Sequence, residues 1–141
     1  TNLQAALGVA QLGKIDKFID KKRGLAKMYH SDLEGIKGVT LHPEMPWAKN
    51  VYWLYSILID ANLYGINRDE LIERLADEGI ETRNFFYPMH VMPIYRKYLS
   101  NGNFPVSERL SSSGINLPSS VKLTDEDIHT ITYSIRKIQR G

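Results

Sequence analysis

The chain has 141 residues, a length that favours a single domain, and its 43% hydrophobic and 24% charged residues are typical of a globular protein. A formal net charge of +2 is too small to indicate a nucleic-acid partner, which usually requires a concentrated basic face. The absence of cysteine excludes a disulfide scaffold, a thiolate nucleophile and a Cys-based zinc site, and it fits a cytoplasmic protein. The longest apolar run, residues 51–59, is shorter than the roughly 20 residues that span a bilayer, so we expect no membrane contact.

The start of the chain carries the pattern of one long helix, because apolar residues recur at helical spacing over residues 2–33. At about 1.5 Å per residue such a helix would be roughly 50 Å long, more than a globule of this size needs. Three glycines would weaken it by roughly 1 kcal/mol each relative to alanine: Gly8, Gly13 and Gly24. We therefore expect the N-terminal half of this helix to pack on an element that the chain does not contain.

The middle of the chain alternates strand and helix signals. Residues 51–60 are rich in β-branched and aromatic side chains and apolar on both faces, which predicts a central strand. Asn67 with Glu70 three residues later is the capping-box pattern of a helix start, and Gly79 is placed to end that helix. A second strand is expected at residues 80–85.

The rest of the chain predicts smaller elements and one strong helix. A helical turn is expected at residues 93–99, a short helix at 107–114 and a third, short strand at 115–118. Thr124 opens the last helix, and four isoleucines at helical spacing form its core face: Ile128, Ile131, Ile135 and Ile138. The predicted fold is α+β, with a short antiparallel sheet covered by helices and a long N-terminal helix.

Several common sites are missing from the sequence. It contains neither a Gly-rich phosphate loop of standard spacing nor a GxSxG nucleophile elbow. Its four histidines do not have the HxxxH or HExxH spacing that places two metal ligands on one helix face. We therefore predict no metal site and no catalytic residue.

The stretch GIETRNFFYPMH, residues 79–90, gathers polar and aromatic side chains at the end of a predicted strand, where scaffolds often display binding groups. Arg83 suits a phosphate or carboxylate, Tyr87 can stack on a base or sugar, and Asn84 and His90 can hydrogen bond to a polar ligand. The alternative is local packing. Phe85 and Phe86 are better read as core residues, and Arg83 could instead pair with Glu81 or Glu78.

Four ordered blocks carry a family resemblance that covers nearly all of the chain: TNLQAALGVAQL, YWLYSILID, GIETRNFFYPMHVMPIY and FPVSERLSSSGINLPSSVKLTDEDI. Together they resemble the C-terminal portion of the sugar aminotransferases of the DegT/DnrJ/EryC1/StrS family. The TRNFFYPMH block most resembles the perosamine synthase branch, which aminates a GDP-linked 4-keto-6-deoxymannose. Asn84 stands where many members of the family have proline.

The resemblance implies a fold-type-I enzyme that depends on pyridoxal 5′-phosphate and transfers an amine from a donor such as glutamate to a nucleotide-linked keto-deoxysugar. The full-length parent is expected to be a homodimer. In the family, the lysine that carries the cofactor and most of the phosphate contacts lie in a large upstream domain. The resemblance implies that residues 1–35 form the long helix that joins this missing large domain to a small α+β domain of residues 36–141. We therefore assign no catalytic or cofactor-binding residue to this chain, and we expect it to be inactive and free of cofactor when alone.

The resemblance also places RNFFYPMH as one wall of an active site that forms between domains and subunits. Substrate-side candidates follow from this placement, the two lysines being candidates for the pyrophosphate: Arg83, Asn84, Tyr87, His90, Tyr95, Lys21 and Lys22.

Two readings without catalysis remain open. The chain could be a stand-alone nucleotide-binding module that uses the same fold. It could also be an oligomerisation domain, because the stripe of Leu3, Leu7 and Ala10 has no obvious core to join within the chain.

Overall fold

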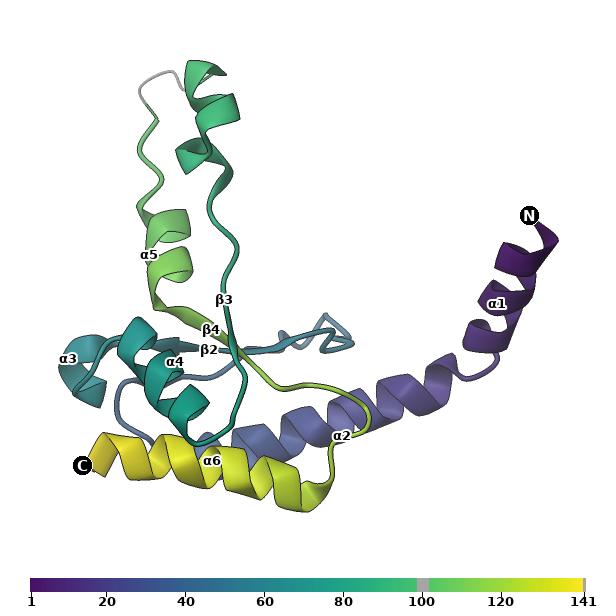
Figure 1. Ribbon diagram of the computed structural model, residues 1–141, viewed down its shortest axis with the longest axis horizontal. Coiled ribbons are helices and arrows are strands. Elements are labelled where there is room, and N and C mark those ends of the chain that lie inside the picture. The colour runs from purple at the N-terminus through teal and green to yellow at the C-terminus, as the bar shows by residue number, and fades with distance from the viewer. Residues whose placement is uncertain (99–101, 141) are drawn as a thin grey trace.

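The computed structural model describes residues 1–98 and 102–140 (Figure 1). Its strands form one antiparallel sheet in the order β1–β2–β4–β3. These strands are β1 (Val39–Thr40), β2 (Tyr55–Ile59), β3 (Arg83–Asn84) and β4 (Gly114–Leu117). The expected antiparallel α+β fold and the central position of β2 are confirmed, although β2 is half as long as the apolar run suggested.

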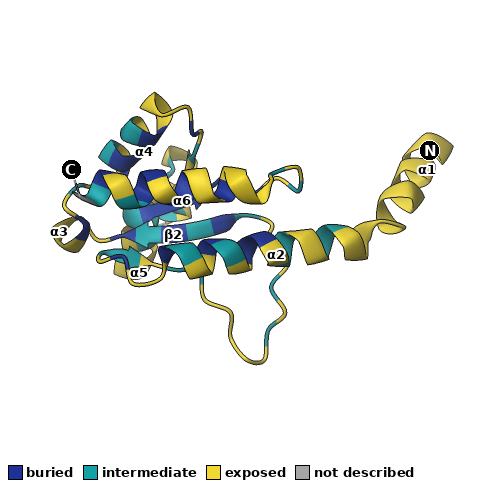
Figure 2. Ribbon diagram, turned by 90° about the horizontal axis from the view of Figure 1, so that it is seen from below, coloured by how far each residue is buried: buried dark blue, intermediate teal, exposed yellow. Residues whose placement is uncertain are grey.

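Two long helices cover one face of the sheet. α2 (Ile15–Leu33) and α6 (Asp125–Arg140) contact each other and lie side by side in front of β2 in Figure 2. α4 (Arg68–Asp77) packs against α6, and the single turn of α3 (Ala61–Tyr64) follows β2. This arrangement leaves the other face of the sheet and its β3 edge to position the functional residues.

The core lies between the sheet and these helices. Alternate residues of β2 are buried, and so is the predicted isoleucine stripe of α6. Each such side chain contributes about 1.5–3 kcal/mol when it is fully buried. The cap of α6 is also as predicted, because the Asp127 N–H donates to the Thr124 hydroxyl while the Asp127 carboxylate accepts from the Thr124 N–H.

The N-terminal helix is two helices rather than the one expected. α1 (Asn2–Leu12) ends before Gly13, and α2 begins after Lys14, whose ψ of 1° and φ of −117° are not helical. Glycine is a poor helix former, and α1 buries none of its residues, so nothing packs along it to hold the two segments in line. In Figure 1, α1 stands apart from the rest of the molecule.

The predicted boundaries of α4 hold, with one difference at its start. The Asn67 side chain accepts from the Glu70 N–H at 2.9 Å, as a cap should. The Glu70 carboxylate does not complete the capping box and pairs instead with Arg74 at 2.6 Å. Gly79 follows the helix with φ +78°, the left-handed conformation that ends many helices.

The sheet edges differ most from expectation. The strand predicted at residues 80–85 pairs only through Arg83 and Asn84, and β1 was not predicted at all. β1 follows Gly38, which has φ +79° and whose missing Cβ would lie 2.4 Å from the Tyr64 nitrogen. A side chain at this position would therefore be both strained and blocked.

An arm projects from the sheet between β3 and β4, and we define it as residues 85–98 and 102–113. It contains the 3₁₀ helices η1 (Met89–Val91) and η2 (Pro93–Tyr98) and the helix α5 (Pro105–Ser113). Figure 1 shows both sides of the arm rising away from α2 and α6. The helical turn expected at residues 93–99 matches η2 as far as Tyr98, and Leu99 lies outside the described residues. Across the described part of the chain, the structure has no helix long and apolar enough to cross a membrane.

Candidate functional site

β3 places the first two candidate residues at the foot of the arm. Arg83 is opposite Asn116 of β4, and Asn84 is opposite Ile115. The Asn116 side chain donates to the Asn84 carbonyl at 3.2 Å and accepts from the Ser56 hydroxyl at 2.7 Å. These bonds link three strands through one buried amide, so the backbone under Arg83 and Asn84 is fixed.

A buried arginine holds the base of the arm. Arg68 donates to the carbonyls of Ser111 at 3.0 Å and Gly114 at 2.7 Å. The Phe85 ring lies so close to Gly114 that an added Cβ would meet ring atoms at 2.4 Å. Sequence reasoning missed these residues, because Arg68 has the position of an ordinary surface residue in the first turn of α4.

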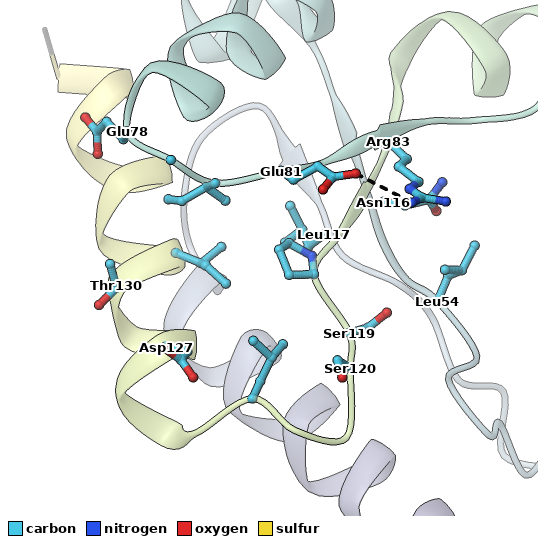
Figure 3. Close-up of a pocket in the computed structure, with 15 residues that line it drawn as sticks. Leu54, Glu78, Glu81, Arg83, Asn116, Leu117, Ser119, Ser120, Asp127 and Thr130 are labelled. Carbon is cyan, nitrogen blue, oxygen red and sulfur yellow. Dashed lines mark hydrogen bonds and ion pairs between the residues drawn. The ribbon is translucent and has the colours of Figure 1, made fainter.

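The Arg83 side chain is 79% exposed. Its contact with Glu81 is 3.5 Å long, and the carboxylate is as exposed as the guanidinium. Figure 3 shows this contact at the rim of a cavity. An exposed pair of this length is worth less than about 1 kcal/mol, so Arg83 retains the capacity to bind an anionic ligand. Pairing with Glu81 occurs, as the packing alternative expected, but it does not occupy the guanidinium fully.

The cavity beside Arg83 has a volume of about 630 Å³ and lies between the β3–β4 edge and α6 (Figure 3). Three carboxylates line it, those of Glu78, Glu81 and Asp127, against the one guanidinium of Arg83. Hydrogen bonds from Thr124 lower the pKa of Asp127, and those from Lys137 and Ser134 lower the pKa of Glu78, so both stay charged. An anion is therefore expected to bind on the arm side of Arg83 rather than inside this cavity. The described residues hold no group of three or more metal-ligating side chains.

His90 joins the two sides of the arm. Its Nε2 lies 3.0 Å from a carboxylate oxygen of Glu108 on α5, and its ring is 4.7 Å from that of Phe104. The imidazole is only 15% exposed. Sequence reasoning did not find Glu108, because a lone glutamate in a short polar helix gives no signal of its partner. With Nε2 engaged, a ligand would be bound through Nδ1.

The remaining arm candidates are exposed aromatic residues. Tyr87 is 74% exposed and Tyr95 is partly exposed. The expectation that both phenylalanines are core residues is wrong, since Phe86 is 76% exposed and Phe85 is only half-buried, with its ring against Gly114 and outside the core. The reason is that the chain leaves the sheet after Asn84, so strand alternation no longer decides which side chains are buried. The exposed apolar surface of the arm is large: Phe86, Tyr87, Met89, Ile94, Tyr98, Phe104 and Val106.

The two candidate lysines lie elsewhere, on α2. Lys22 donates to the carbonyl of Trp53 at 2.9 Å and to that of Ser119, and burial lowers its pKa. Lys21 makes a longer contact, 3.4 Å, with the Val121 carbonyl. Among the described residues, no hydrogen bond links these lysines to the arm candidates. Lys22 thus joins α2 to two loops by hydrogen bonds. The ammonium group of Lys21 is less engaged than that of Lys22, because it makes one longer hydrogen bond instead of two.

Comparison with known proteins shows which family the chain belongs to. Residues 1–136 match the profile of the DegT/DnrJ/EryC1/StrS aminotransferase family. The chain is 41% identical over 136 residues to the GDP-perosamine synthase of Vibrio cholerae, covering 96% of this chain and 36% of the relative. It is 30% identical over 130 residues to a Bacillus subtilis protein named as a pyridoxal phosphate-dependent aminotransferase, EpsN, covering 90% of this chain and 33% of the relative.

A solved structure gives the same result. The crystal structure of DesI, determined in the presence of its TDP-sugar product, superposes with a TM-score of 0.88 at 28% identity, covering 96% of this chain and 34% of DesI. The chain belongs to the DegT/DnrJ/EryC1/StrS aminotransferase family and corresponds to its C-terminal portion. It spans about a third of the length of the relatives it matches. The family resemblance read from the sequence is thereby confirmed.

Proposed function

We propose that this chain is the C-terminal part of an aminotransferase that moves an amine from an amino acid, glutamate by expectation, to the keto group of a nucleotide-linked deoxysugar. The observation that carries the proposal is the 41% identity to a GDP-perosamine synthase over nearly the whole chain. Pyridoxal phosphate, when bound, would supply the electron sink for this chemistry. A GDP-linked sugar is the first substrate to test.

We infer that the cofactor is held by the domain that precedes this portion in the relatives. A lysine that carries the cofactor needs an amine free to form a covalent bond. Among the residues that the structure describes, Lys22 is the lysine whose pKa is lowered by burial, and its ammonium is already used by two backbone carbonyls. Lys22 therefore does not fit that role, and we expect the isolated chain to bind no cofactor.

The chain's own contribution would be to bind and orient the nucleotide-sugar along the arm. Arg83 offers an exposed fork of donors for a phosphate. Tyr87 and Tyr95 offer aromatic faces for a base or sugar ring, and Asn84 offers an exposed side-chain amide. His90 is held in place by Glu108 and would donate through Nδ1. Of the two lysines, Lys21 is the better candidate for the pyrophosphate.

The exposed face of α1 supports an assembly with other parts of an enzyme. Leu3, Leu7, Val9 and Leu12 are all largely exposed, and no residue of α1 is buried. Large apolar side chains left exposed along a whole helix mark an interface. We propose that α1 packs on the preceding domain, and that the arm reaches the active site of a homodimeric parent enzyme.

A chimera tests the proposal. In it, this chain replaces the matching C-terminal residues of the Vibrio cholerae GDP-perosamine synthase, and amine transfer from glutamate to GDP-4-keto-6-deoxymannose is measured. The expected result is a dimer that binds cofactor and has activity well above that of the truncated relative. A chimera that folds and binds cofactor, but aminates neither GDP-linked nor TDP-linked keto-sugars, would contradict the proposal.

Two measurements on the isolated chain separate the alternatives: nucleotide binding by calorimetry, and self-association. Tight binding of GDP by the chain alone, unaffected by a coexpressed large domain, would favour a stand-alone binding module. Self-association that is lost when Leu3 and Leu7 are replaced by serine would favour an oligomerisation domain.

A further inference from the structure

A second cavity lies between α2 and the loop of residues 41–54 that joins β1 to β2. Its volume is about 450 Å³. Arg23 and Lys27 of α2 line one wall together with Glu34, which follows that helix, and His42 and Tyr55 belong to the other. We call it the α2–loop cavity. It shares no lining residue with the cavity beside Arg83.

Two polar atoms at this cavity are buried and have no hydrogen-bond partner: the Tyr55 hydroxyl and His42 Nδ1. Tyr55 is only 1% exposed, and its ring stacks on Tyr29 at 4.8 Å. The hydroxyl therefore has a fixed position with almost no access to solvent, and no hydrogen bond compensates for its burial. A buried polar group left unpaired destabilises a fold, so a pair of them at one cavity requires an explanation.

The hydrogen bonds around His42 define what it offers. The Tyr52 N–H donates to Asn50 Oδ1 at 2.8 Å, so the Asn50 Nδ2 is the donor to His42 Nε2, 3.0 Å away. Burial lowers the pKa of His42, which keeps the ring neutral. A neutral imidazole that accepts at Nε2 carries its proton on Nδ1. The unpaired Nδ1 is thus a donor.

The Tyr55 hydroxyl is also available as a donor. Burial raises its pKa, so the group stays protonated. A carbonyl oxygen, with two lone pairs, can accept from both groups at once. The neighbouring Tyr52 has φ +46°, and backbone strain of this kind in a non-glycine residue occurs preferentially at ligand sites.

The charges at the cavity favour a neutral ligand. Its lining holds two bases, Arg23 and Lys27, and two acids, Glu34 and Glu44. Arg23 and Glu44 form a two-pronged pair, with oxygen–nitrogen distances of 2.6 and 3.2 Å, which lowers the pKa of Glu44 to about 2. A permanently charged carboxylate in the wall repels a second anion, and the guanidinium that could offset it is already engaged.

We propose that the α2–loop cavity binds a small neutral molecule whose carbonyl oxygen accepts hydrogen bonds from His42 Nδ1 and the Tyr55 hydroxyl. The rings of His42, Tyr52 and Tyr55 contact one another, with centroids 5.4 to 6.2 Å apart, and would form one wall against the apolar part of that molecule. This site is independent of the proposed nucleotide-sugar function.

Benzamide is a suitable probe because it joins a neutral carbonyl to an aromatic ring. Toluene and benzoate are its controls, the first lacking the acceptor and the second carrying a charge. Binding is followed by NMR titration of the His42 Nδ1 and Tyr55 ring signals in the wild type, in Tyr55→Phe and in Tyr133→Phe, which alters an exposed tyrosine of α6. We expect benzamide to bind at least tenfold more tightly than toluene and benzoate, and Tyr55→Phe alone to remove most of that advantage.

Urea unfolding without ligand gives a second, independent readout. Tyr55→Phe removes an unpaired buried hydroxyl, so its unfolding midpoint should equal or exceed that of the wild type. A lower midpoint would mean that the hydroxyl has a structural partner, such as water or His42 itself, and would overturn the proposal. Equal shifts with benzamide and toluene, or tighter binding of benzoate, would overturn it as well.

Discussion

We call the sheet with α2, α4 and α6 the body of the molecule, and α1 and the arm its projecting parts. Large apolar side chains are buried in the body and exposed in the projecting parts. Between the sheet, α2 and α6, side chains such as Tyr55 and Ile135 are almost completely buried. Along the arm and α1, side chains of equal size, such as Phe86 and Leu7, are largely exposed. The body can therefore stabilise itself, whereas the projecting parts can gain stability only from other molecules or domains.

The largest effect is expected where the body has no free space. Gly38→Ala would place a Cβ 2.4 Å from the Tyr64 nitrogen, at a φ of +79°. Overpacking and backbone strain each cost about 1–3 kcal/mol, so the free energy of unfolding should fall by roughly 3 kcal/mol or more. Urea denaturation measures the change.

Gly35→Ala is the matched control for this prediction. Gly35 has nearly the same φ, +77°, but nothing lies within 4 Å of its missing Cβ. Only the backbone strain applies, so the loss should be about 1 kcal/mol. Equal losses for the two variants would show that the contact with Tyr64 is unimportant.

A pair of leucine substitutions contrasts the body with α1. Leu75 of α4 is fully buried, whereas Leu7 of α1 is 60% exposed. Leu75→Ala should lower the free energy of unfolding by about 2–5 kcal/mol, because it leaves a cavity. Leu7→Ala in the isolated chain should change it by less than about 0.5 kcal/mol. In the chimera, however, Leu7→Ala should weaken the assembly; a large effect already in the isolated chain would mean that α1 packs on the body.

The base of the arm is expected to show an intermediate effect. Gly114→Ala would push its Cβ into the Phe85 ring, which must move, at a cost of about 1–3 kcal/mol. Gly24→Ala is the control, since Gly24 lies in α2 with open space around it and should gain up to about 1 kcal/mol. NMR contacts between Phe85 and β4 should be lost only in the first variant. Unchanged contacts would show that the Phe85 ring does not pack against Gly114.

The smallest effect concerns pH. The Arg23 pair lowers the pKa of Glu44 from 4.5 to about 2, so the folded state holds Glu44 deprotonated more strongly than the unfolded chain does. This contribution is complete above about pH 5 and is lost as the pH falls toward 2. The stability difference between wild type and Glu44→Gln should therefore be larger at pH 7 than at pH 3. A difference that does not vary with pH would show that the ion pair contributes nothing.

Much of the body could be predicted from the sequence, because local signals and burial agree there. The Asn67 cap, the isoleucine stripe of α6 and the apolar β2 each have a pattern that only one structure satisfies. β1 could not be predicted, since two residues carry no periodicity. The break at Gly13–Lys14 was missed because helical spacing continues across it, and only the missing packing partner of α1 makes the break visible.

The site was less predictable than the fold. Arg83 and Tyr87 were found because an exposed arginine and aromatic ring after a strand suggest binding. The partners that fix their surroundings, Arg68, Asn116 and Glu108, lie 15 or more residues away along the chain, and nothing in the sequence pairs them with the arm. Long-range side-chain bonds of this kind are set by the tertiary fold, not by local patterns.

The most direct test of the central claim is the amine-transfer activity of the chimera with Arg83→Gln, compared with Arg74→Gln. Arg74 also forms a partly exposed ion pair, but it lies on α4, away from the arm. Loss of one charge-assisted contact to a phosphate costs about 1.5–3 kcal/mol, so Arg83→Gln should lower kcat/KM by about 10- to 150-fold, and Arg83→Lys should recover part of it. Arg74→Gln should leave kcat/KM unchanged. If Arg83→Gln and Arg74→Gln retain equal activity, the β3 edge at the foot of the arm does not bind the substrate and the proposed function of this chain is wrong.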